Sequence, residues 1–244
     1  MTDNDDAQSN PYEVFLSGET IDLVIPNEHA IEVDGWHRWF NDPNVTRYSD
    51  HGAFPNTIEN QRRILTSFTA PDSRLLALLI QPKGQQNVVG IVSLSNISTL
   101  HRSAETAVIV NNRTGGTGRL FYGLEAKARI TEHAFETMGL ERVSGAQARP
   151  LAAWQCYQVL FGFRPEGIKR DAFRRGYHVE DSILSSCTLA DYLKVKEARG
   201  GAYWPGREKL LELARNLPKQ SIADQVAAAI DGAVADYLKD VKYD

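Results

Sequence analysis

The sequence predicts a mixed α/β fold in which helices pack around one β-sheet. Residues 75–80 form a continuous apolar run, which suits a strand that is buried on both faces. Strand patterns at 88–94 and 106–110 follow at short spacing, so the three strands are expected to pair as an antiparallel meander. A long amphipathic helix pattern and further alternating strands and helices come next, and this order is typical of helices layered on one sheet.

The N-terminal third is expected to contribute a tail, one strand and two helices. Residues 1–10 are polar and acidic and are predicted to form a disordered tail. Residues 21–25 read as a strand that ends at a Pro-Asn pair, and residues 28–40 as one helix that ends before Pro43. A second helix is predicted to begin after Thr57, with a stripe formed by Ile58, Arg62, Leu65 and Phe68.

The longest predicted helix follows the meander and is the strongest periodic signal in the chain. Its core-facing positions recur at steps of three and four residues, as expected for an amphipathic helix; they are Leu120, Leu124, Ala128, Thr131, Phe135 and Met138. Gly139 stands where a helix C-cap is expected. A strand at 142–146, a short helix at 151–160 and a last strand at 183–189 complete the predicted sheet and its helices.

After Tyr192 the pattern changes to helices separated by Gly and Pro pairs. One helix is predicted over 208–217, and a second opens at Ser221, whose spacing to Asp224 resembles a capping box. The predicted organisation is therefore a tail over 1–10, a main domain over 11–192 and a helical extension over 193–244. The amphipathic helices of this extension need an apolar partner surface, either on the same chain or in a homodimer.

Composition restricts the class of function. The chain has 244 residues, 42% of them hydrophobic and 24% charged, which is ordinary for a globular protein with a real core. The formal net charge of −4 argues against nucleic acid as the main partner. Neither a signal peptide nor a membrane span is recognised, so a cytoplasmic location is expected, and two cysteines without zinc-ligand spacing predict no metal site.

The segment between the third meander strand and the long helix carries the clearest chemical signal. Glycines at a helix start allow close approach of a ligand to the backbone, and the free N–H groups of the first helical turn attract anions. Two arginines add positive charge, so the segment suits a diphosphate; it consists of Arg113, Thr114, Gly115, Gly116, Thr117, Gly118 and Arg119. No Lys-Ser or Lys-Thr pair follows the glycines, so the segment is not a Walker motif.

The spacing Arg113-x-x-Gly116-x-Gly118 resembles the signature of the GNAT acetyltransferases, and the wider chain resembles their branch that modifies protein N-termini, sugars and antibiotics. Further likeness lies in Trp36–Thr46, Val88–Leu94, Ala104-Glu105 and Gly162–Gly167. The resemblance covers roughly residues 14 to 191. It implies a GNAT fold with a C-terminal helical extension, acetyl-CoA as co-substrate and no metal.

The resemblance also implies where the cofactor and the catalytic groups lie. In a GNAT fold two central strands separate, and pantetheine bonds to the free edge of one of them; here that edge would be Ala107, Val108, Ile109 and Val110. Glu105 is the implied general base for the amine and Tyr157 the implied general acid for the CoA thiolate. Relatives often carry a pantetheine-binding Asn near the start of the short helix; here that role is either vacant or filled by Gln147 or Gln155.

The implied acceptor site involves Trp39, Arg47, Tyr48 and His51. The leading interpretation is acetylation of a primary amine on a small molecule, with an amino sugar or nucleotide sugar favoured. Acetylation of a protein N-terminus is the close alternative, and a non-catalytic acyl-CoA-binding or scaffold module is the alternative from another class.

Overall fold

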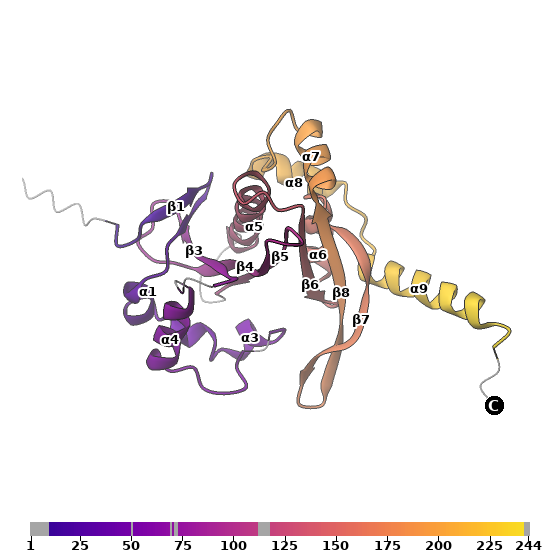
Figure 1. Ribbon diagram of the computed structural model, residues 1–244, viewed down its shortest axis with the longest axis horizontal. Helices are drawn as coiled ribbons and strands as arrows, with labels where there is room; N and C mark the ends of the chain where they lie inside the picture. The colour runs from indigo at the N-terminus through magenta and orange to yellow at the C-terminus, as the bar shows by residue number, and fades with distance from the viewer. Residues whose placement is uncertain (1–9, 50, 69, 71–72, 112–117, 242–244) are drawn as a thin grey trace, which may run out of the picture.

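The structure, a computed structural model, describes residues 10–49, 51–68, 70, 73–111 and 118–241. Within these residues eight strands form one sheet in the order β1-β2-β3-β4-β5-β6-β8-β7, and helices cover it (Figure 1). The strands are β1 (Val14–Ser17), β2 (Ile21–Val24), β3 (Leu76–Pro82), β4 (Gly90–Ser98), β5 (Ser103–Val110), β6 (Arg142–Ala148), β7 (Arg164–Arg175) and β8 (His178–Thr188). The helices are α1 (Glu28–Glu32), α2 (Trp36–Trp39), α3 (Pro43–Thr46), α4 (Ile58–Phe68), α5 (Gly118–Glu136), α6 (Ala152–Val159), α7 (Leu189–Ala198), α8 (Arg207–Arg215) and α9 (Ile222–Leu238).

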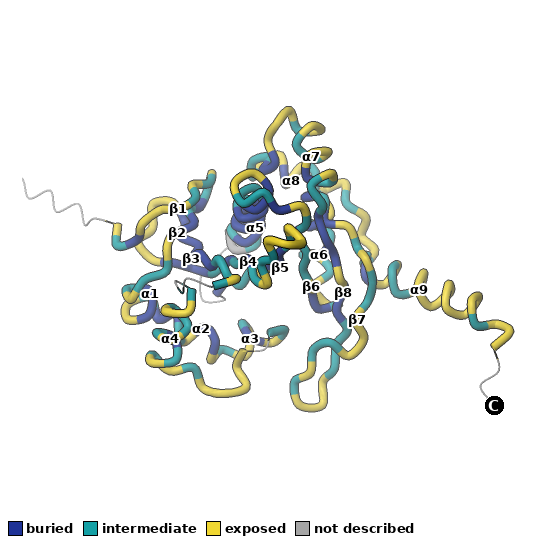
Figure 2. The backbone as a smooth tube through the Cα atoms, viewed as in Figure 1, coloured by how far each residue is buried: buried dark blue, intermediate teal, exposed yellow. Residues whose placement is uncertain are grey.

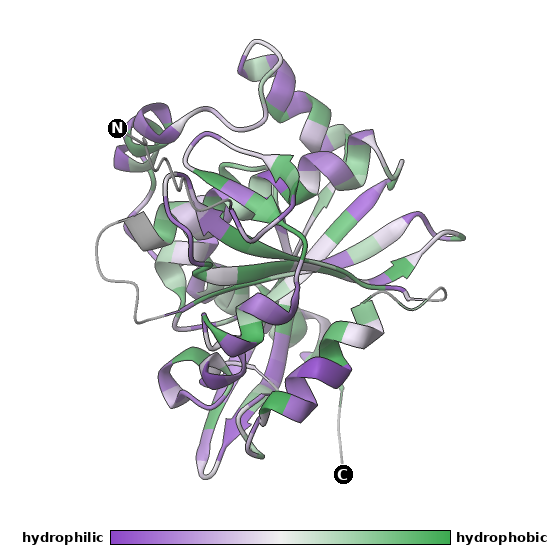
Figure 3. Ribbon diagram, turned by 90° about the vertical axis from the view of Figure 1, so that its left-hand side faces the viewer, coloured by the Kyte–Doolittle hydropathy of each residue, from purple (hydrophilic) through white to green (hydrophobic). Residues whose placement is uncertain are grey.

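The predicted mixed α/β architecture is confirmed, with one packed layer on each face of the sheet. Alternate residues of β3 serve the two layers, since Leu78 and Ile80 join the larger core with α5 while Leu79 joins a second core with α1, α2 and α4. Because β3 supplies both cores, almost its whole length is buried, as the continuous apolar run predicts. The central strands carry long hydrophobic stretches (Figure 3).

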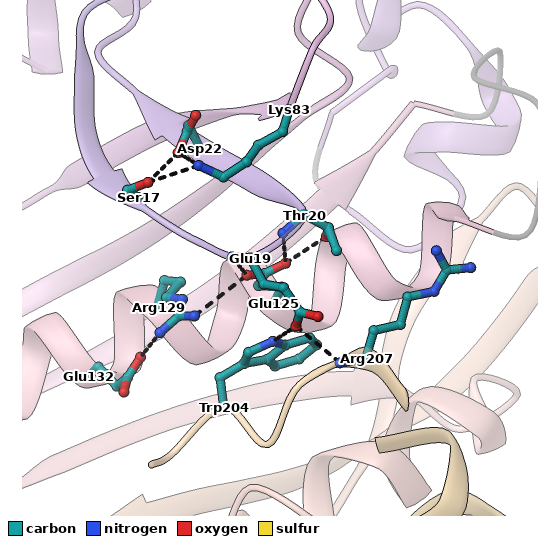
Figure 4. A network of polar contacts seen from close by, with 10 residues as sticks. All are labelled: Ser17, Glu19, Thr20, Asp22, Lys83, Glu125, Arg129, Glu132, Trp204 and Arg207. Carbon is teal, nitrogen blue, oxygen red and sulfur yellow. Dashed lines mark hydrogen bonds and ion pairs between the residues drawn. The ribbon is translucent and has the colours of Figure 1, made fainter. Parts of the chain in front are cut away.

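α5 is the central helix of the larger core and is largely buried (Figure 2). Its buried side chains include polar as well as apolar ones. The fully buried Glu125 carboxylate accepts hydrogen bonds from the Thr20 N–H at 2.9 Å, the Thr20 hydroxyl at 2.6 Å and the Glu19 N–H. Arg129 lies 3.6 Å from the same carboxylate, and Trp204 donates to the Glu19 carboxylate at 2.6 Å (Figure 4). Glu125 thus ties the turn between β1 and β2 to α5, and Glu19 ties that turn to the C-terminal segment.

The single helix predicted over 28–40 is wrong, because the structure has two short helices there. α1 ends at Glu32, and α2 begins after Gly35, whose φ of +67° is a left-handed conformation that favours glycine. The Asp34 carboxylate accepts hydrogen bonds from the Tyr12 hydroxyl at 2.6 Å and the Val88 N–H at 2.8 Å. These contacts with distant residues hold the chain in a turn where local periodicity favours a helix.

Four further elements were not predicted from the sequence: β1, α3, β7 and α7. β7 and β8 form a long hairpin at one edge of the sheet, so β8 is longer than the predicted strand over 183–189. Asn10, assigned to the disordered tail, exchanges hydrogen bonds of 2.9 and 3.0 Å with Gln81, whereas residues 1–9 lie outside the described residues. The left-handed conformation expected of a C-cap glycine is present, since Gly139 has a φ of +64° in the turn that follows the end of α5 at Glu136.

The C-terminal extension is only partly an appendage. The predicted boundary between residues 192 and 193 falls inside α7, and Tyr203, Trp204 and Leu210 are buried in the larger core. α9 begins with the predicted cap, because Ser221 accepts a hydrogen bond from the Asp224 N–H, and its N-terminal part contacts β7 and α6. Figure 1 shows the remainder of α9 extending away from the body of the molecule.

Candidate active site

The two central strands β5 and β6 pair over a short distance and then separate. They are the one parallel pair among the described strands, with register partners from Ser103–Arg142 to Glu105–Ser144. Beyond Glu105, β5 continues to pair with β4 and β6 continues to pair with β8. A gap therefore opens in the middle of the sheet, as the expectation of two separating strands requires.

The free edge of β5 presents backbone groups to this gap. The Asn111 N–H donates to the Val89 carbonyl at 2.7 Å, so Asn111 bonds toward β4. In an antiparallel pair alternate residues direct both backbone groups to the same neighbour, so Ile109 also bonds toward β4. Val108 and Val110 then direct their N–H and C=O groups into the gap, where no described strand pairs with them. This edge suits an extended ligand with amide groups.

A cavity of about 790 Å³ fills the gap and reaches both faces of the sheet. Its walls come from β5, β6, the start of α6, α5, the segment around α3, and β7. The lining residues are Asn44, Val45, Arg47, Tyr48, Ser49, Thr106, Ala107, Val108, Ile109, Val110, Leu120, Gly123, Lys127, Ala146, Gln147, Ala148, Pro150, Leu151, Ala152, Ala153, Trp154 and Phe173. A second depression, of about 360 Å³, lies along α4 and involves none of these residues.

Several predicted site residues meet at this cavity. Ala107, Val108, Ile109 and Val110 line it, as do the acceptor candidates Arg47 and Tyr48. Glu105 is exposed at the point where β5 and β6 separate. Its side chain shares a face of β5 with Ala107 and Ile109, because side chains alternate along a strand. Ile109 packs against the core of α1, α2 and α4, so Glu105 faces the same side of the sheet as Arg47.

Other predicted site residues lie elsewhere. Trp39 is buried in the second core and does not line the cavity, because its indole fills the space between the sheet and α4. His51 packs its ring 4.4 Å from the Phe40 ring. Tyr157 packs, partly buried, against the larger core and is not one of the cavity-lining residues.

The predicted diphosphate loop falls largely outside the described residues, which exclude Arg113, Thr114, Gly115, Gly116 and Thr117. The backbone of Gly118 and Arg119 forms the first turn of α5, as predicted, but the Arg119 side chain also lies outside the description. The described part of the site therefore consists of the free strand edge, the cavity and the helix that follows the loop.

The end of the cavity that carries the acceptor candidates Arg47 and Tyr48 is held by contacts between segments far apart in sequence. The rings of Tyr48 and Phe173 meet edge to face with centroids 6.1 Å apart. The Arg175 guanidinium donates to the Thr46 carbonyl at 3.0 Å, to the Ser49 carbonyl at 2.6 Å and to the His51 carbonyl. The β7–β8 hairpin thus fixes the segment that carries Arg47 and Tyr48. Sequence reasoning missed Phe173 because β7 itself was not recognised.

Lys127 is an unusual cavity residue because its ammonium group is buried. Its Nζ donates to the Gln158 Oε1 at 2.6 Å and lies 3.9 Å from the centroid of the Phe163 ring. Burial lowers the pKa of Lys127 from 10.5 to about 7, since no described carboxylate forms an ion pair with it. The burial of Lys127 could have been predicted from the sequence. Lys127 is three residues after Leu124, so both side chains lie on the core-facing side of the helix.

Of the two glutamines considered for pantetheine binding, Gln147 lies at the cavity. It lines the wall contributed by β6, and its Oε1 accepts from the Ser185 hydroxyl at 3.3 Å. Gln155 directs its Nε2 instead to the carbonyls of Ala148 and Arg149, at 2.9 and 3.2 Å, and so caps the turn between β6 and α6. The structure therefore favours Gln147 as the amide available to a ligand.

Two other findings concern the described residues alone. None of the described helices combines the length and the apolar character needed to traverse a bilayer. No three His, Cys, Asp or Glu side chains among the described residues come together in a group that could hold a metal ion.

Comparison with known proteins gives a consistent result. Residues 25–149 match the family model described as an acetyltransferase (GNAT) domain. RimJ of Mycobacterium smegmatis, in complex with CoA-disulfide, is similar in structure with a TM-score of 0.61 and 20% identity, over 75% of this chain and 91% of that one. Spermidine N-acetyltransferase of Vibrio cholerae, in complex with CoA and spermine, is similar with a TM-score of 0.62 and 18% identity, over 72% of this chain and 99% of that one. A search of curated protein sequences finds no match.

Proposed function

Because the chain belongs to the GNAT acetyltransferase family, we propose that it moves the acetyl group of acetyl-CoA directly onto a primary amine of a small molecule. One observation carries the proposal: the cavity between the separated strands β5 and β6, into which Val108 and Val110 direct unpaired backbone groups. Pantetheine carries amides that match such an edge, and the first turn of α5 follows directly on the predicted diphosphate loop. RimJ and spermidine N-acetyltransferase, which share this fold, were both solved with CoA or its disulfide.

Glu105 is the proposed general base. An alkyl ammonium has a pKa of about 10, so it must lose a proton before its nitrogen can attack the thioester carbonyl. Glu105 stands where the strands separate, on the same side of the sheet as Arg47 and Tyr48. The nitrogen–carbon bond forms, the carbon–sulfur bond breaks, and the amine proton passes to the carboxylate directly or through water.

The leaving thiolate must also receive a proton. Tyr157 remains the proposed donor by resemblance, although it packs beside the cavity and does not line it. Lys127 is a second candidate, because it lines the cavity and its pKa of about 7 makes both protonation states accessible at neutral pH. Tyr157→Phe and Lys127→Met therefore distinguish the two candidates by which of them lowers kcat.

A small-molecule acceptor is favoured over a protein N-terminus by the contacts at the end of the cavity that carries Arg47. The contact between Tyr48 and Phe173 and the three hydrogen bonds of Arg175 join the α3 segment to the β7–β8 hairpin. An extended peptide needs an open groove, whereas two joined segments beside the cavity suit a compact acceptor such as an amino sugar or nucleotide sugar. The cytoplasmic location and the absence of nucleic acid, membrane and metal partners stay predictions from composition.

The deciding experiment is calorimetric titration of acetyl-CoA into the parent protein and into an Arg113→Glu/Gly116→Asp variant, followed by an amine screen that detects free thiol. Micromolar binding that the variant loses, together with turnover on a primary amine, is expected. Binding without turnover on any amine or peptide would favour the non-catalytic module, and turnover on peptides alone would favour the protein N-terminal function.

A homodimer is also proposed, with α9 as its contact. Beyond its contacts with β7 and α6, α9 carries exposed apolar side chains at Ile230, Val234 and Tyr237, with exposed fractions of 38%, 49% and 86%. These positions recur at steps of four and three, so they lie on one side of the helix. A second copy of α9 would cover this stripe.

A further inference from the structure

The charge of the cavity wall differs in sign from the charge of the whole protein. The chain carries a formal net charge of −4, yet none of the described residues that line the cavity is Asp or Glu. Two of them, Arg47 and Lys127, are basic. Lys127 is buried among core residues next to α6, so Arg47 supplies the permanent positive charge on the acceptor side of the sheet.

Several described arginines pair with a carboxylate, whereas Arg47 pairs with none of the carboxylates that the structure describes. Arg62, Arg102, Arg142 and Arg149 each form an ion pair of 2.9 Å or shorter with Glu or Asp. Arg47 forms no ion pair with any residue that the structure describes, and its guanidinium carbon instead lies 5.3 Å from the centroid of the Tyr48 ring. Its donors are therefore available to a ligand in the cavity.

The backbone segment that carries Arg47 is held in place. Tyr48, whose ring lies 5.3 Å from the Arg47 guanidinium carbon, meets Phe173 edge to face, and the Arg175 hydrogen bonds fix the backbone on both sides of Arg47. The planar fork of a guanidinium matches carboxylate and phosphate oxygens. The same charge repels acceptors that carry several ammonium groups.

We infer that the acceptor amine also carries an anionic group, a carboxylate or a phosphate, which Arg47 binds while the amine lies near Glu105. This inference rests on the proposed acetyl transfer and narrows its substrate class. An anion-binding arginine distinguishes this site from a polyamine site, because a polyamine site needs carboxylates to hold the additional ammonium groups. The overall negative charge of the protein does not conflict with it, because charges beyond about 8–10 Å are screened at physiological ionic strength.

The test compares matched acceptors. Glucosamine 6-phosphate against glucosamine tests a phosphate, 6-aminohexanoate against hexylamine tests a carboxylate, and spermidine tests a polycation. The anionic member of at least one pair should have a kcat/KM about tenfold or more above its neutral partner, mainly through a lower KM. The pair that shows the difference identifies the anion.

Two variants complete the test. Arg47→Gln should remove the preference for the anionic member by lowering the kcat/KM of that member about tenfold or more. Arg38→Gln removes the same charge from an exposed position on α2 that does not line the cavity. This control variant should change neither the preference nor the kcat/KM for the anionic member. An unchanged preference in Arg47→Gln, equal kcat/KM within both pairs, or a higher kcat/KM for spermidine would overturn the inference.

A failure of the proposed acetyl transfer can be distinguished from a failure of the anion site. If no acceptor is acetylated, the same five amines are titrated into the acetyl-CoA-loaded parent and into the Arg47→Gln protein by calorimetry. Binding of the anionic amines that Arg47→Gln weakens about tenfold or more would support the anion site without catalysis. Equal binding of anionic and neutral amines by the parent would overturn it.

Discussion

Glu105 on β5 and Ser144 on β6 are the last register partners of the parallel strand pair, and the two strands separate directly beyond them. Glu105 therefore stands where the gap between the strands begins, next to the cavity-lining Thr106 and on the side of the sheet that carries Arg47 and Tyr48, although it does not itself line the cavity. The register between β4 and β5 also shifts close to this point. The shift lies between Ser95 and Ser98 of β4, and Ser95 is the partner of Glu105. The irregularity lies on β4 and leaves the pairing of β5 with β4 regular from Glu105 to Val110.

We expect Glu105→Gln to lower kcat by about 100-fold or more, the typical contribution of a general base. The amide cannot accept the amine proton, but it keeps the shape of the side chain, so the Kd for acetyl-CoA should stay unchanged. Steady-state kinetics and calorimetry measure the two quantities. Glu212→Gln removes an equally negative charge from the exposed face of α8 and serves as the control; a Glu105→Gln enzyme as fast as this control would exclude the role of base.

The free edge of β5 gives a prediction about cofactor binding. Val108→Pro removes one N–H that points into the gap and should raise the Kd for acetyl-CoA about fivefold, because one hydrogen bond contributes about 1 kcal/mol. The fold should survive, since proline is tolerated where a strand edge has no neighbour. Ile109→Pro is the matched control: it removes an N–H that bonds to β4 and should unfold the protein at a lower urea concentration. Unchanged acetyl-CoA binding by Val108→Pro would place pantetheine elsewhere.

Lys127 predicts a pH dependence of stability. Burial lowers its pKa to about 7 from the ordinary value of 10.5, so between these pH values the unfolded chain binds a proton that the folded chain does not. The free energy of unfolding should therefore rise with pH above about 7, and the cost of burying the charge is fully present below that pH. Lys127→Met should stabilise the protein at pH 6 by on the order of 1–4 kcal/mol and flatten the rise.

Urea unfolding at pH 6 to 9 measures this effect. Lys219→Met, at an exposed position before α9, controls for the loss of one positive charge and should leave the slope unchanged. Equal slopes in the parent and in Lys127→Met would mean that the Lys127 ammonium is solvated in the folded state.

We expect the loss of the buried Glu125 charge to lower the free energy of unfolding. Glu125→Gln replaces an acceptor of hydrogen bonds from Thr20 and Glu19 by an amide whose NH₂ faces those donors. The loss should be about 1–3 kcal/mol of unfolding free energy. Glu132→Gln, which removes a partly exposed partner of Arg129 on the same helix, should cost much less. Equal losses in urea unfolding would show that the contact with the β1–β2 turn contributes nothing particular.

The exposed stripe of α9 predicts the oligomeric state. The parent should be a dimer by light scattering at micromolar concentration, and Val234→Asp/Tyr237→Asp should be a monomer with an unchanged melting temperature. Substitution is the sharper approach, because a truncation after Tyr192 would also remove Tyr203, Trp204 and Leu210 from the larger core. A monomeric parent, or a dimer that tolerates the two aspartates, would remove α9 as the contact.

The sequence by itself determined the features that depend on neighbouring residues. The apolar run of β3, the three- and four-residue spacing of α5, the left-handed Gly139 and the Ser221 cap were all predicted and are all present. The strand edge at Val108 and the acceptor residues Arg47 and Tyr48 followed from the family resemblance, and the structure brings them to one cavity.

Only the tertiary structure decided the features that depend on distant residues. Asp34 breaks the predicted helix because its carboxylate binds Tyr12 and Val88. Phe173 lines the cavity because β7 pairs with β8, a strand that is longer than the sequence predicted. Tryptophan is a residue type that often forms binding platforms, yet Trp39 is buried by packing. Lysine is usually a surface residue, yet Lys127 is buried. Burial and long-range hydrogen bonds are set by the whole fold, so local sequence patterns do not contain them.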